Sequence, residues 1–321
     1  MMKKFFITGA AGFIGSHVCE QILNKFPNSK IIALDKLTYA GNKFFLKNII
    51  NKNNFTFIKS DILKTKKYIG YLKNIDCAIN TAAESHVDNS FENSIDFTKT
   101  NTLGAHIFLE NCIKNKVKKI IHISTDEVYG DKIKGKSYEF DSLNPTNPYS
   151  ASKAAAEMIA GSYKYFFKKD IVIIRANNIY GTRQFPEKLI PSCIVSLINN
   201  KKIQIHGNGK NKRHYLFVKD FCEALEIIIR KVNNGIYNIG SNECFENIKI
   251  AKKICSLMNK SNKNIRYIKD RPFNDRRYAV SSKKIRDLGW KPKAKIFKEL
   301  NQIIDWYKKN NKIFSKNISK K

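Results

Sequence analysis

The sequence predicts an α/β protein, built on a doubly wound parallel sheet and completed by a smaller C-terminal lobe that binds the substrate. Over the first half of the chain, short runs rich in β-branched residues alternate with longer helical patterns. Runs such as IIAL and IVII are apolar at every position, which suits strands that helices cover on both faces. With 321 residues, of which 42% are hydrophobic, the chain can bury a substantial core. These observations together favour a doubly wound fold.

The expected strands lie in the first half of the chain, at 3–8, 30–35, 55–59, 76–81, 119–124 and 171–175. Beyond residue 176 the alternation becomes irregular, with helical patterns at 188–200, 219–231, 246–258 and 298–310. We therefore divide the chain into a sheet domain at 1–176 and a lobe at 177–321, segments of which can return to the first domain.

The formal net charge of +32 raises the question of an anionic partner. Lysines are spread through nearly every segment, whereas nucleic-acid footprints are localised. We therefore expect no specific nucleic-acid partner, because attraction of a phosphorylated substrate is a simpler use of the charge. A nucleic-acid-binding or regulatory protein that merely kept an enzyme fold is the alternative left open.

The seven cysteines are isolated from one another, with no C-x-x-C and no metal-like Cys/His spacing. We expect buried thiols in a reducing cytosol and no metal site. The start, MMKKFFITGAAGFIGSHV, imitates a signal peptide, but its glycines have another explanation. Because no apolar run reaches 18 residues, we expect a cytoplasmic protein with no membrane partner.

The first expected strand ends in TGAAGFIGS, which places Gly9, Gly12 and Gly15 directly before a helix. Glycines let the backbone approach a pyrophosphate, which then binds at the positive end of that helix. Asp35 ends the second strand, where an acid would hydrogen-bond the adenosine ribose and repel a 2′-phosphate. This context predicts a Rossmann-type site for NAD, although Lys36 weakens the preference over NADP slightly.

A second motif, NPTNPYSASKAAAE, starts a helix with Asn147 as its N-cap and Pro148 in its first turn. Tyr149 and Lys153 are four residues apart, so they share one face of the helix. An ammonium group beside a phenol stabilises the phenolate and can lower the pKa of Tyr149 from about 10. The pair therefore predicts a base for a hydroxyl proton.

Together with the glycine turn and Thr125 at the end of the intervening strand, the Tyr149–Lys153 pair resembles the extended short-chain dehydrogenase/reductases. The adjacent carboxyls Asp126 and Glu127 then distinguish between reactions. An epimerase needs only hydride removal and return, whereas elimination of water also needs a base for a C–H proton and an acid for the leaving hydroxyl. Two carboxyls can serve if different environments separate their pKa values.

The chain accordingly resembles nucleotide-sugar 4,6-dehydratases of the dTDP-glucose type over essentially its whole length. The motifs that carry the resemblance occur in order: DKLTYAGN (35–42), AAESHVDNS (82–90), STDEVYG (124–130), YSASK (149–153), NNIYG with QFPEKLIP (177–191) and DRPFNDRRYAV (270–280).

The resemblance implies that an NDP-glucose loses hydride from C4 to bound NAD while Tyr149 takes the proton of the 4-hydroxyl. Glu127 would remove the C5 proton and Asp126 would protonate the departing 6-hydroxyl, after which hydride returns to C6. The product is NDP-4-keto-6-deoxyglucose, which starts the route toward deoxysugars such as rhamnose. The cofactor ends oxidised, so NAD is expected to stay bound.

The resemblance also implies which residues bind the cofactor and the nucleotide-sugar substrate. Those expected at the cofactor are Gly9, Gly12, Phe13, Ile14, Gly15, Asp35, Lys36, Leu37, Thr38, Asp61, Ile62, Ala82, Ala83, Ser85, Thr100, Tyr149, Lys153 and Asn178. Those expected at the substrate are Ser85, Thr125, Asn177, Lys188, Leu189, His206, Arg213, Asn242, Arg271 and Asn274. The arginines suit a diphosphate, because the guanidinium fork matches phosphate oxygens.

The chain departs from the family pattern at a few positions. Ala10 replaces a glycine, which is tolerable if its φ is negative. His206 and Tyr215 replace the Tyr and Trp of bacterial dTDP-glucose enzymes, and VDNSFENSIDFTKTN is similar to UDP-glucose 4,6-dehydratases. Because one methyl group of a base is worth only about 1–3 kcal/mol in a pocket, we favour dTDP-glucose and leave UDP-glucose open. An epimerase or decarboxylase on the same fold is the other open alternative.

The resemblance also implies a dimer, because relatives of this type are commonly joined through helices in a four-helix arrangement. The apolar positions of the segment 93–113 and of the Tyr149 helix suit such an interface, so we expect a homodimer. Covering the sheet is the other use that those apolar faces can have.

Overall fold

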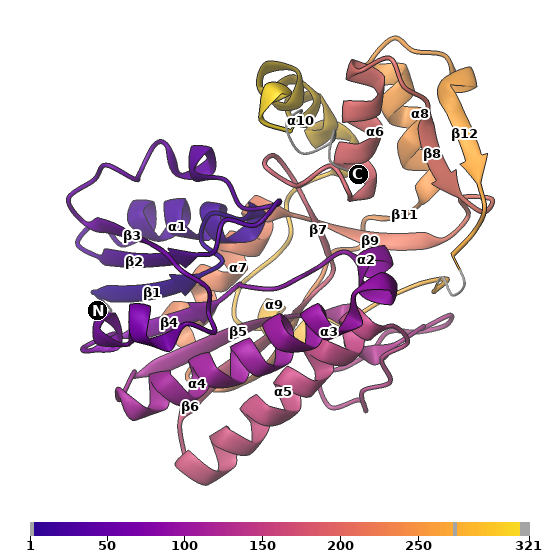
Figure 1. Cartoon of the computed structure of the whole chain (residues 1–321). Helices are drawn as coiled ribbons and strands as arrows, with labels where there is room; N and C mark the ends of the chain where they lie inside the picture. The colour runs from indigo at the N-terminus through magenta and orange to yellow at the C-terminus, as the bar shows by residue number, and fades with distance from the viewer. Residues whose placement is uncertain (1–2, 272–274, 315–321) are drawn as a thin grey trace.

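The computed structural model describes residues 3–271 and 275–314, and within these ranges seven parallel strands form one central sheet (Figure 1). The strand order is β10-β6-β5-β4-β1-β2-β3, which reverses direction between β1 and β4. The strands are β1 (Lys4–Thr8), β2 (Lys30–Asp35), β3 (Phe55–Lys59), β4 (Cys77–Asn80), β5 (Lys119–Thr125), β6 (Asp170–Ala176) and β10 (Gly235–Ile239). The predicted doubly wound fold is confirmed, and the six predicted strands agree with β1 to β6 within one residue at each end.

Helical segments connect these strands and build much of the second lobe. The α-helices are α1 (Phe13–Lys25), α2 (Val87–Glu92), α3 (Ser94–Phe97), α4 (Ala105–Lys114), α5 (Pro148–Phe167), α6 (Leu189–Ile198), α7 (Val218–Lys231), α8 (Asn247–Leu257), α9 (Lys283–Arg286) and α10 (Ile296–Asn310). Short 3₁₀ turns are η1 (Lys43–Leu46), η2 (Thr65–Lys67), η3 (Ile69–Leu72), η5 (Asp126–Tyr129) and η6 (Asn262–Asn264), and η4 (Thr98–Gly104) is a π-helical stretch between α3 and α4.

Helices cover both faces of the sheet. Helices α1 and α7 pack on one face, and α4 and α5 pack on the other. Strand β1 illustrates why the strands are apolar at successive positions. Its side chains alternate between the two faces, and both faces are buried: Phe5 and Ile7 join the core under α1, and Phe6 joins the core under α4.

The second lobe lies above the carboxyl ends of the strands in the view of Figure 1. Strands β7 (Asn178–Tyr180), β9 (Lys212–Phe217) and β11 (Cys244–Glu246) form a small sheet in the order β11-β9-β7. Strands β8 (Ile203–His206) and β12 (Ile265–Ile268) pair in parallel beside α6 and α8. The four helices predicted beyond residue 176 correspond to α6, α7, α8 and α10, within two residues at each end.

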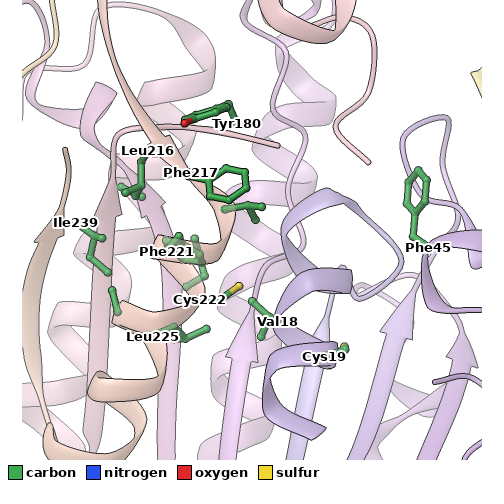
Figure 2. Close-up of a cluster of buried hydrophobic side chains, with 14 of the residues drawn as sticks. Val18, Cys19, Phe45, Tyr180, Leu216, Phe217, Phe221, Cys222, Leu225 and Ile239 are labelled. Carbon is green, nitrogen blue, oxygen red and sulfur yellow. The ribbon is translucent and has the colours of Figure 1, made fainter. Parts of the chain in front are cut away.

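Part of the C-terminal half returns to the sheet domain. Strand β10 pairs in parallel with β6 at one edge of the central sheet. Figure 2 shows Phe221, Cys222 and Leu225 of α7 beside Val18 and Cys19 of α1. A strand and a helix from beyond residue 176 thus complete the sheet and its cover.

The seven cysteines are free thiols, and only Cys244 is not fully buried. Over residues 3–271 and 275–314, we find no helix with both the length and the apolar character needed to cross a bilayer.

Candidate active site

The carboxyl ends of the central strands open into a cavity, which is where ligands bind in doubly wound sheets. Its walls come from the glycine turn, from the segments after β2, β3, β4 and β5, and from the start of α5. A second cavity lies toward the C-terminal lobe, and the two share six lining residues, among them Glu127, Asn178 and Lys188. A dinucleotide and a second ligand could therefore meet at Glu127.

The glycine turn brings the N-terminus of α1 to the wall of the first cavity. Gly9 has a φ of +64°, which favours glycine. A Cβ atom on Gly15 would lie 2.1 Å from the carbonyl oxygen of Gly9, so α1 can start against the turn only because Gly15 has no side chain. Ala10 does not appear among the described residues with positive φ, which meets the condition set from the sequence.

Asp35 ends β2 at the rim of the same cavity. Its Oδ2 accepts a hydrogen bond from the backbone N–H of Ala11 at 2.9 Å, and its Oδ1 accepts one from Leu37 at 2.7 Å. Burial raises the pKa of Asp35, while these backbone donors lower it. The carboxyl is thus held in one orientation beside the glycine turn.

Asp126 and Glu127 occupy the 3₁₀ turn η5 that follows β5, and both line the first cavity together with Tyr149. The Thr125 hydroxyl caps this turn by accepting from the N–H of Glu127 at 3.2 Å. Asn177 Nδ2 donates to Asp126 Oδ2 at 2.6 Å, and Asn147 Nδ2 donates to Glu127 Oε2 at 3.4 Å. The acid pair therefore points into the cleft that contains the phenol.

The two carboxyls have different electrostatic surroundings. Burial and the neighbouring charge of Glu127 raise the pKa of Asp126 to about 7, against a lowering by the Asn177 amide and by the charge of Arg213. Burial also raises the pKa of Glu127, but the cations of Lys188 and Arg213 oppose that rise. Asp126 is thus suited to hold a proton near neutral pH, and Glu127 is the carboxyl whose anion Lys188 stabilises in addition to Arg213.

Helix α5 presents Tyr149 and Lys153 to the first cavity. Its start is fixed as predicted, because Asn147 and Ser150 form a reciprocal capping box and Pro148 occupies the first turn. Lys153 Nζ donates to the carbonyl oxygen of Ile123 at 2.6 Å. Burial lowers the pKa of Lys153 to about 8, and the carboxylate of Glu157 on the same helix opposes this.

The expected lowering of the Tyr149 pKa is wrong for this structure. Burial raises that pKa far above its usual range, and the charge of Glu127 adds to the rise, while a hydrogen bond with Thr125 lowers it. The ammonium group of Lys153 does not offset these effects, because it is directed to the backbone of β5.

The second cavity carries several cations. Lys188 Nζ donates to the Ser85 carbonyl oxygen at 2.5 Å, and Arg213 donates to the Asp275 carbonyl oxygen at 2.9 Å. Arg271 forms an ion pair with Asp88, with 2.6 Å between Nε and Oδ1. Lysine and arginine at one cavity suit a ligand with a diphosphate.

The structure brings most of the predicted binding residues to these two cavities. The expected cofactor residues line the first cavity except Leu37, whose side chain packs against the hydrophobic core. Ser85, Thr125 and Asn177 also line the first cavity, whereas Leu189, His206, Arg213 and Arg271 line the second. Asn242 is exposed and lines neither cavity, and Asn274 lies outside the described residues.

Several lining residues were not predicted from the sequence. Glu84 lines the first cavity, Glu187 lines both, and Asp88 and Tyr278 line the second. Each lies inside one of the motifs that carry the family resemblance, so proximity to a matched residue was the available signal. In the part of the chain that the structure describes, no cluster of three or more His, Cys, Asp or Glu side chains could hold a metal ion.

Comparison with known proteins relates both the sequence and the fold to one group of enzymes. The family model described as GDP-mannose 4,6 dehydratase matches residues 6–303. A dTDP-D-glucose 4,6-dehydratase from Dictyostelium discoideum is 43% identical, with 96% of this chain and 82% of that protein covered. The Arabidopsis thaliana protein RHM2, a trifunctional UDP-glucose 4,6-dehydratase, epimerase and reductase, is 40% identical over 96% of this chain and 47% of its own length.

Among solved structures, DesIV from Streptomyces venezuelae superposes with a TM-score of 0.95 at 33% sequence identity. The match covers 98% of this chain and 99% of that one, and the structure is that of a dTDP-glucose 4,6-dehydratase with NAD bound. The relation therefore extends over both lobes and both cavities.

Proposed function

The chain belongs to the GDP-mannose 4,6-dehydratase family, and we propose that it converts dTDP-glucose into dTDP-4-keto-6-deoxyglucose with a bound NAD. The observation that carries this proposal is the position of Asp126, Glu127 and Tyr149, which line one cavity together with a glycine turn. A phenol alone would suit simple oxidation of a hydroxyl, and the two carboxyls add the acid and the base that elimination of water requires.

The first cavity fits NAD on the structure of this chain. Because Gly15 has no side chain, the start of α1 packs directly against the Gly9 carbonyl oxygen, which brings the helix N-terminus, the end that binds a pyrophosphate, to the wall of the cavity. Asp35 lies at the end of β2, where its carboxyl can receive ribose hydroxyls. When bound, NAD supplies a hydride acceptor, then a hydride donor, and in its oxidised form a positive charge on the nicotinamide ring.

In the oxidation step, Tyr149 takes the proton of the sugar 4-hydroxyl, assisted by Thr125. The buried phenol holds its own proton strongly in this environment, so it can act as a base only with cationic help. Lys153 is a cation of this chain that lines the same cavity, but its ammonium group is directed to the Ile123 carbonyl oxygen and does not by itself offset the effect of burial on Tyr149.

In the elimination step, Glu127 removes the proton at C5 and Asp126 protonates the leaving 6-hydroxyl. This assignment is supported by the pKa of about 7 at Asp126 and by the cations beside Glu127. A buried carboxyl that retains its proton near neutral pH is suited to act as a general acid.

The second cavity is the proposed site of the nucleoside diphosphate, with Lys188, Arg213 and Arg271 as the phosphate-binding cations. UDP-glucose is the second candidate substrate, because the Arabidopsis relative is named for activity on that sugar. We place dTDP-glucose first because the relative from Dictyostelium and the DesIV structure both carry that name.

The decisive experiment incubates the purified protein and NAD with dTDP-glucose, UDP-glucose and GDP-mannose in parallel, and follows the products by mass spectrometry. We expect dTDP-glucose to lose one water with the highest kcat/KM, by roughly tenfold or more over UDP-glucose. A product of unchanged mass would indicate an epimerase, and loss of water from none of the three sugars would defeat the proposal.

We also propose that the protein is a homodimer that pairs through α5 and the segment before α4. Apolar side chains there are largely exposed, with Met158 at 71%, Ile95 at 68% and Leu103 at 48%. Light scattering coupled to size exclusion tests this: the wild-type chain is expected at twice the monomer mass, and Met158→Glu at the monomer mass.

A further inference from the structure

A buried polar network lies directly behind the acid pair, outside the cavity residues that were predicted. Glu157 on α5, Arg175 on β6 and Ser124 on β5 are only 3%, 3% and 6% exposed. Glu157 follows Tyr149 and Lys153 at intervals of four residues, so the three side chains lie along one face of α5. The network therefore begins about one helical turn after Lys153, where this face of α5 is buried in the protein interior.

Every polar atom of the Glu157 and Arg175 side chains has a hydrogen-bond or ion-pair partner. Glu157 Oε1 accepts a hydrogen bond from the Ser124 hydroxyl, and Glu157 Oε2 accepts one from Arg175 Nε at 2.8 Å, with a second guanidinium nitrogen at 2.7 Å. The remaining guanidinium nitrogen donates to the Tyr129 hydroxyl at 2.6 Å, and that hydroxyl donates to Asn238 Oδ1 at 2.9 Å. The network thus joins α5, β5, β6, β10 and the turn η5.

Three members of the network lie close in sequence to residues of the proposed site. Ser124 directly precedes Thr125 and the acid pair, and Tyr129 ends the turn that holds that pair. Arg175 stands two residues before Asn177, whose amide binds Asp126. A displacement of any one of these side chains would move an element that carries part of the reaction.

We propose that the Glu157–Arg175 pair is a positioning device for the 4,6-dehydratase reaction, which fixes the Asp126–Glu127 turn relative to Tyr149 and Lys153 and places a fixed negative charge on the inner side of Lys153. The catalytic part of this proposal rests on the proposed function. The titratable groups that interact with Lys153 are Glu157 from α5 and His122 from β5, and Tyr149, Asp126 and Glu127 line the same cavity as Lys153. Of these, Glu157 is the carboxylate that lies on the side away from the cavity.

A purely structural role makes a different prediction. Replacing a buried ion pair by apolar or neutral groups of similar size is often neutral for stability, whereas removing one partner leaves an uncompensated charge. The test therefore uses the double variant Glu157→Gln with Arg175→Met, which removes both charges together. Ser124→Ala is the second variant, because it breaks the link to β5 and keeps the ion pair. The control is Glu226→Gln with Arg230→Met, a Glu–Arg pair on α7 that lines neither cavity.

Amide hydrogen exchange provides a readout that needs no substrate. We expect faster exchange at 124–130 in both network variants and wild-type exchange there in the control. Wild-type exchange at 124–130 in Ser124→Ala and in the double variant would overturn the positioning claim, even if the enzyme acts on another sugar. If the double variant does not fold, Ser124→Ala decides alone.

Kinetics provide the second readout. We expect kcat to fall about tenfold or more in both network variants with KM little changed, because misplacement of reacting groups lowers the rate more than binding. In the double variant, the pH at which single-turnover NADH formation declines on the alkaline side should fall by about one unit, because Lys153 loses its carboxylate neighbour. A melting temperature that falls while kcat and this pH remain at wild-type values would assign the pair to stability alone.

Discussion

At the scale of single residues, the central feature is that Asp126 and Glu127 are adjacent in sequence but differ in electrostatic surroundings. Both are buried, so both carboxyls lose solvation. Arg213 lowers the pKa of both carboxyls, whereas the negative charge of Glu127 raises the pKa of Asp126 and the positive charge of Lys188 lowers the pKa of Glu127. One short turn can therefore supply an acid and a base at the same pH.

This difference predicts the pH dependence of the dehydration. Activity should fall as the pH rises through about 7, because Asp126 then loses the proton that it donates. On the acid side, activity should fall as Glu127 becomes protonated. Asp126→Asn should lower kcat by about 10²- to 10⁴-fold but still permit NADH formation from the sugar, which stopped-flow absorbance can follow. A wild-type rate that is constant from pH 6 to 8, or full turnover in Asp126→Asn, would contradict the assignment.

The same burial predicts a conflict between activity and stability at Asp126. A carboxyl whose pKa rises from about 3.9 to about 7 on folding binds its proton more tightly in the folded state. Its contribution to the free energy of unfolding therefore decreases as the pH rises through that interval. Asp126→Asn should raise the melting temperature, with a larger gain at pH 8 than at pH 5. The exposed Asp305→Asn on α10 is the control and should show no such difference between the two pH values.

At the scale of elements, two glycines illustrate how local space decides what a helix tolerates. Gly15 lies in the first turn of α1, where an added Cβ would meet the Gly9 carbonyl oxygen at 2.1 Å and the Ala10 Cα at 2.8 Å. Gly161 lies inside α5, and an added Cβ there would have no described heavy atom within 4 Å outside its own helix turn. The first glycine is required by the contact between turn and helix, whereas the second is not.

Alanine at these two positions should therefore have opposite effects. Gly15→Ala should displace the start of α1, lower the melting temperature and abolish measurable NAD binding in calorimetry. Gly161→Ala should raise the free energy of unfolding by about 0.5–1 kcal/mol, because alanine is the better helix former. Equal NAD affinity in Gly15→Ala and wild type would show that the glycine turn does not bind the dinucleotide.

The sequence was sufficient for elements with local patterns. The strands β1 to β6 carry apolar runs, and the start of α5 carries the Asn147–Pro148 signature, so both could be predicted. The pairing of β10 with β6 could not, because the run GIYNI is short and its partner lies some sixty residues earlier. The contact of Glu157 with Arg175 is non-local in the same way, since neither residue carries a pattern that names its partner.

The same distinction between local patterns and non-local contacts applies to the candidate site. Glycine spacing and the Tyr149–Lys153 interval are local, so the nucleotide end and the phenol were predictable. The raised pKa of Tyr149 was not, because it depends on burial and on Glu127, which approaches from another element. The packing of Leu37 against the core, with its backbone N–H bound to Asp35, is likewise a property of the folded turn.

At the scale of the whole molecule, the family resemblance read from the sequence is confirmed over both lobes. The segment that contains α2 links the two parts across the second cavity. Asp88 pairs with Arg271, and the Ser85 carbonyl oxygen accepts from Lys188. Two cations proposed to bind the diphosphate are thus oriented by the sheet domain before the substrate arrives.

This arrangement predicts that Asp88 contributes to substrate affinity although it is itself an anion. Arg271 Nη2 donates to Asp88 Oδ2 at 2.9 Å while Nε lies 2.6 Å from Oδ1, so the carboxylate fixes the plane of the guanidinium. Both side chains are partly exposed, so the pair is worth no more than about 1 kcal/mol.

Asp88→Asn should therefore raise KM for the nucleotide-sugar by about two- to fivefold with kcat nearly unchanged. The difference from wild type should shrink at high salt, where exposed charges are screened. Asp96→Asn, an exposed acid that lines neither cavity, is the control and should leave KM unchanged. A lower KM in Asp88→Asn would show the opposite relation, in which Asp88 competes with the diphosphate for Arg271.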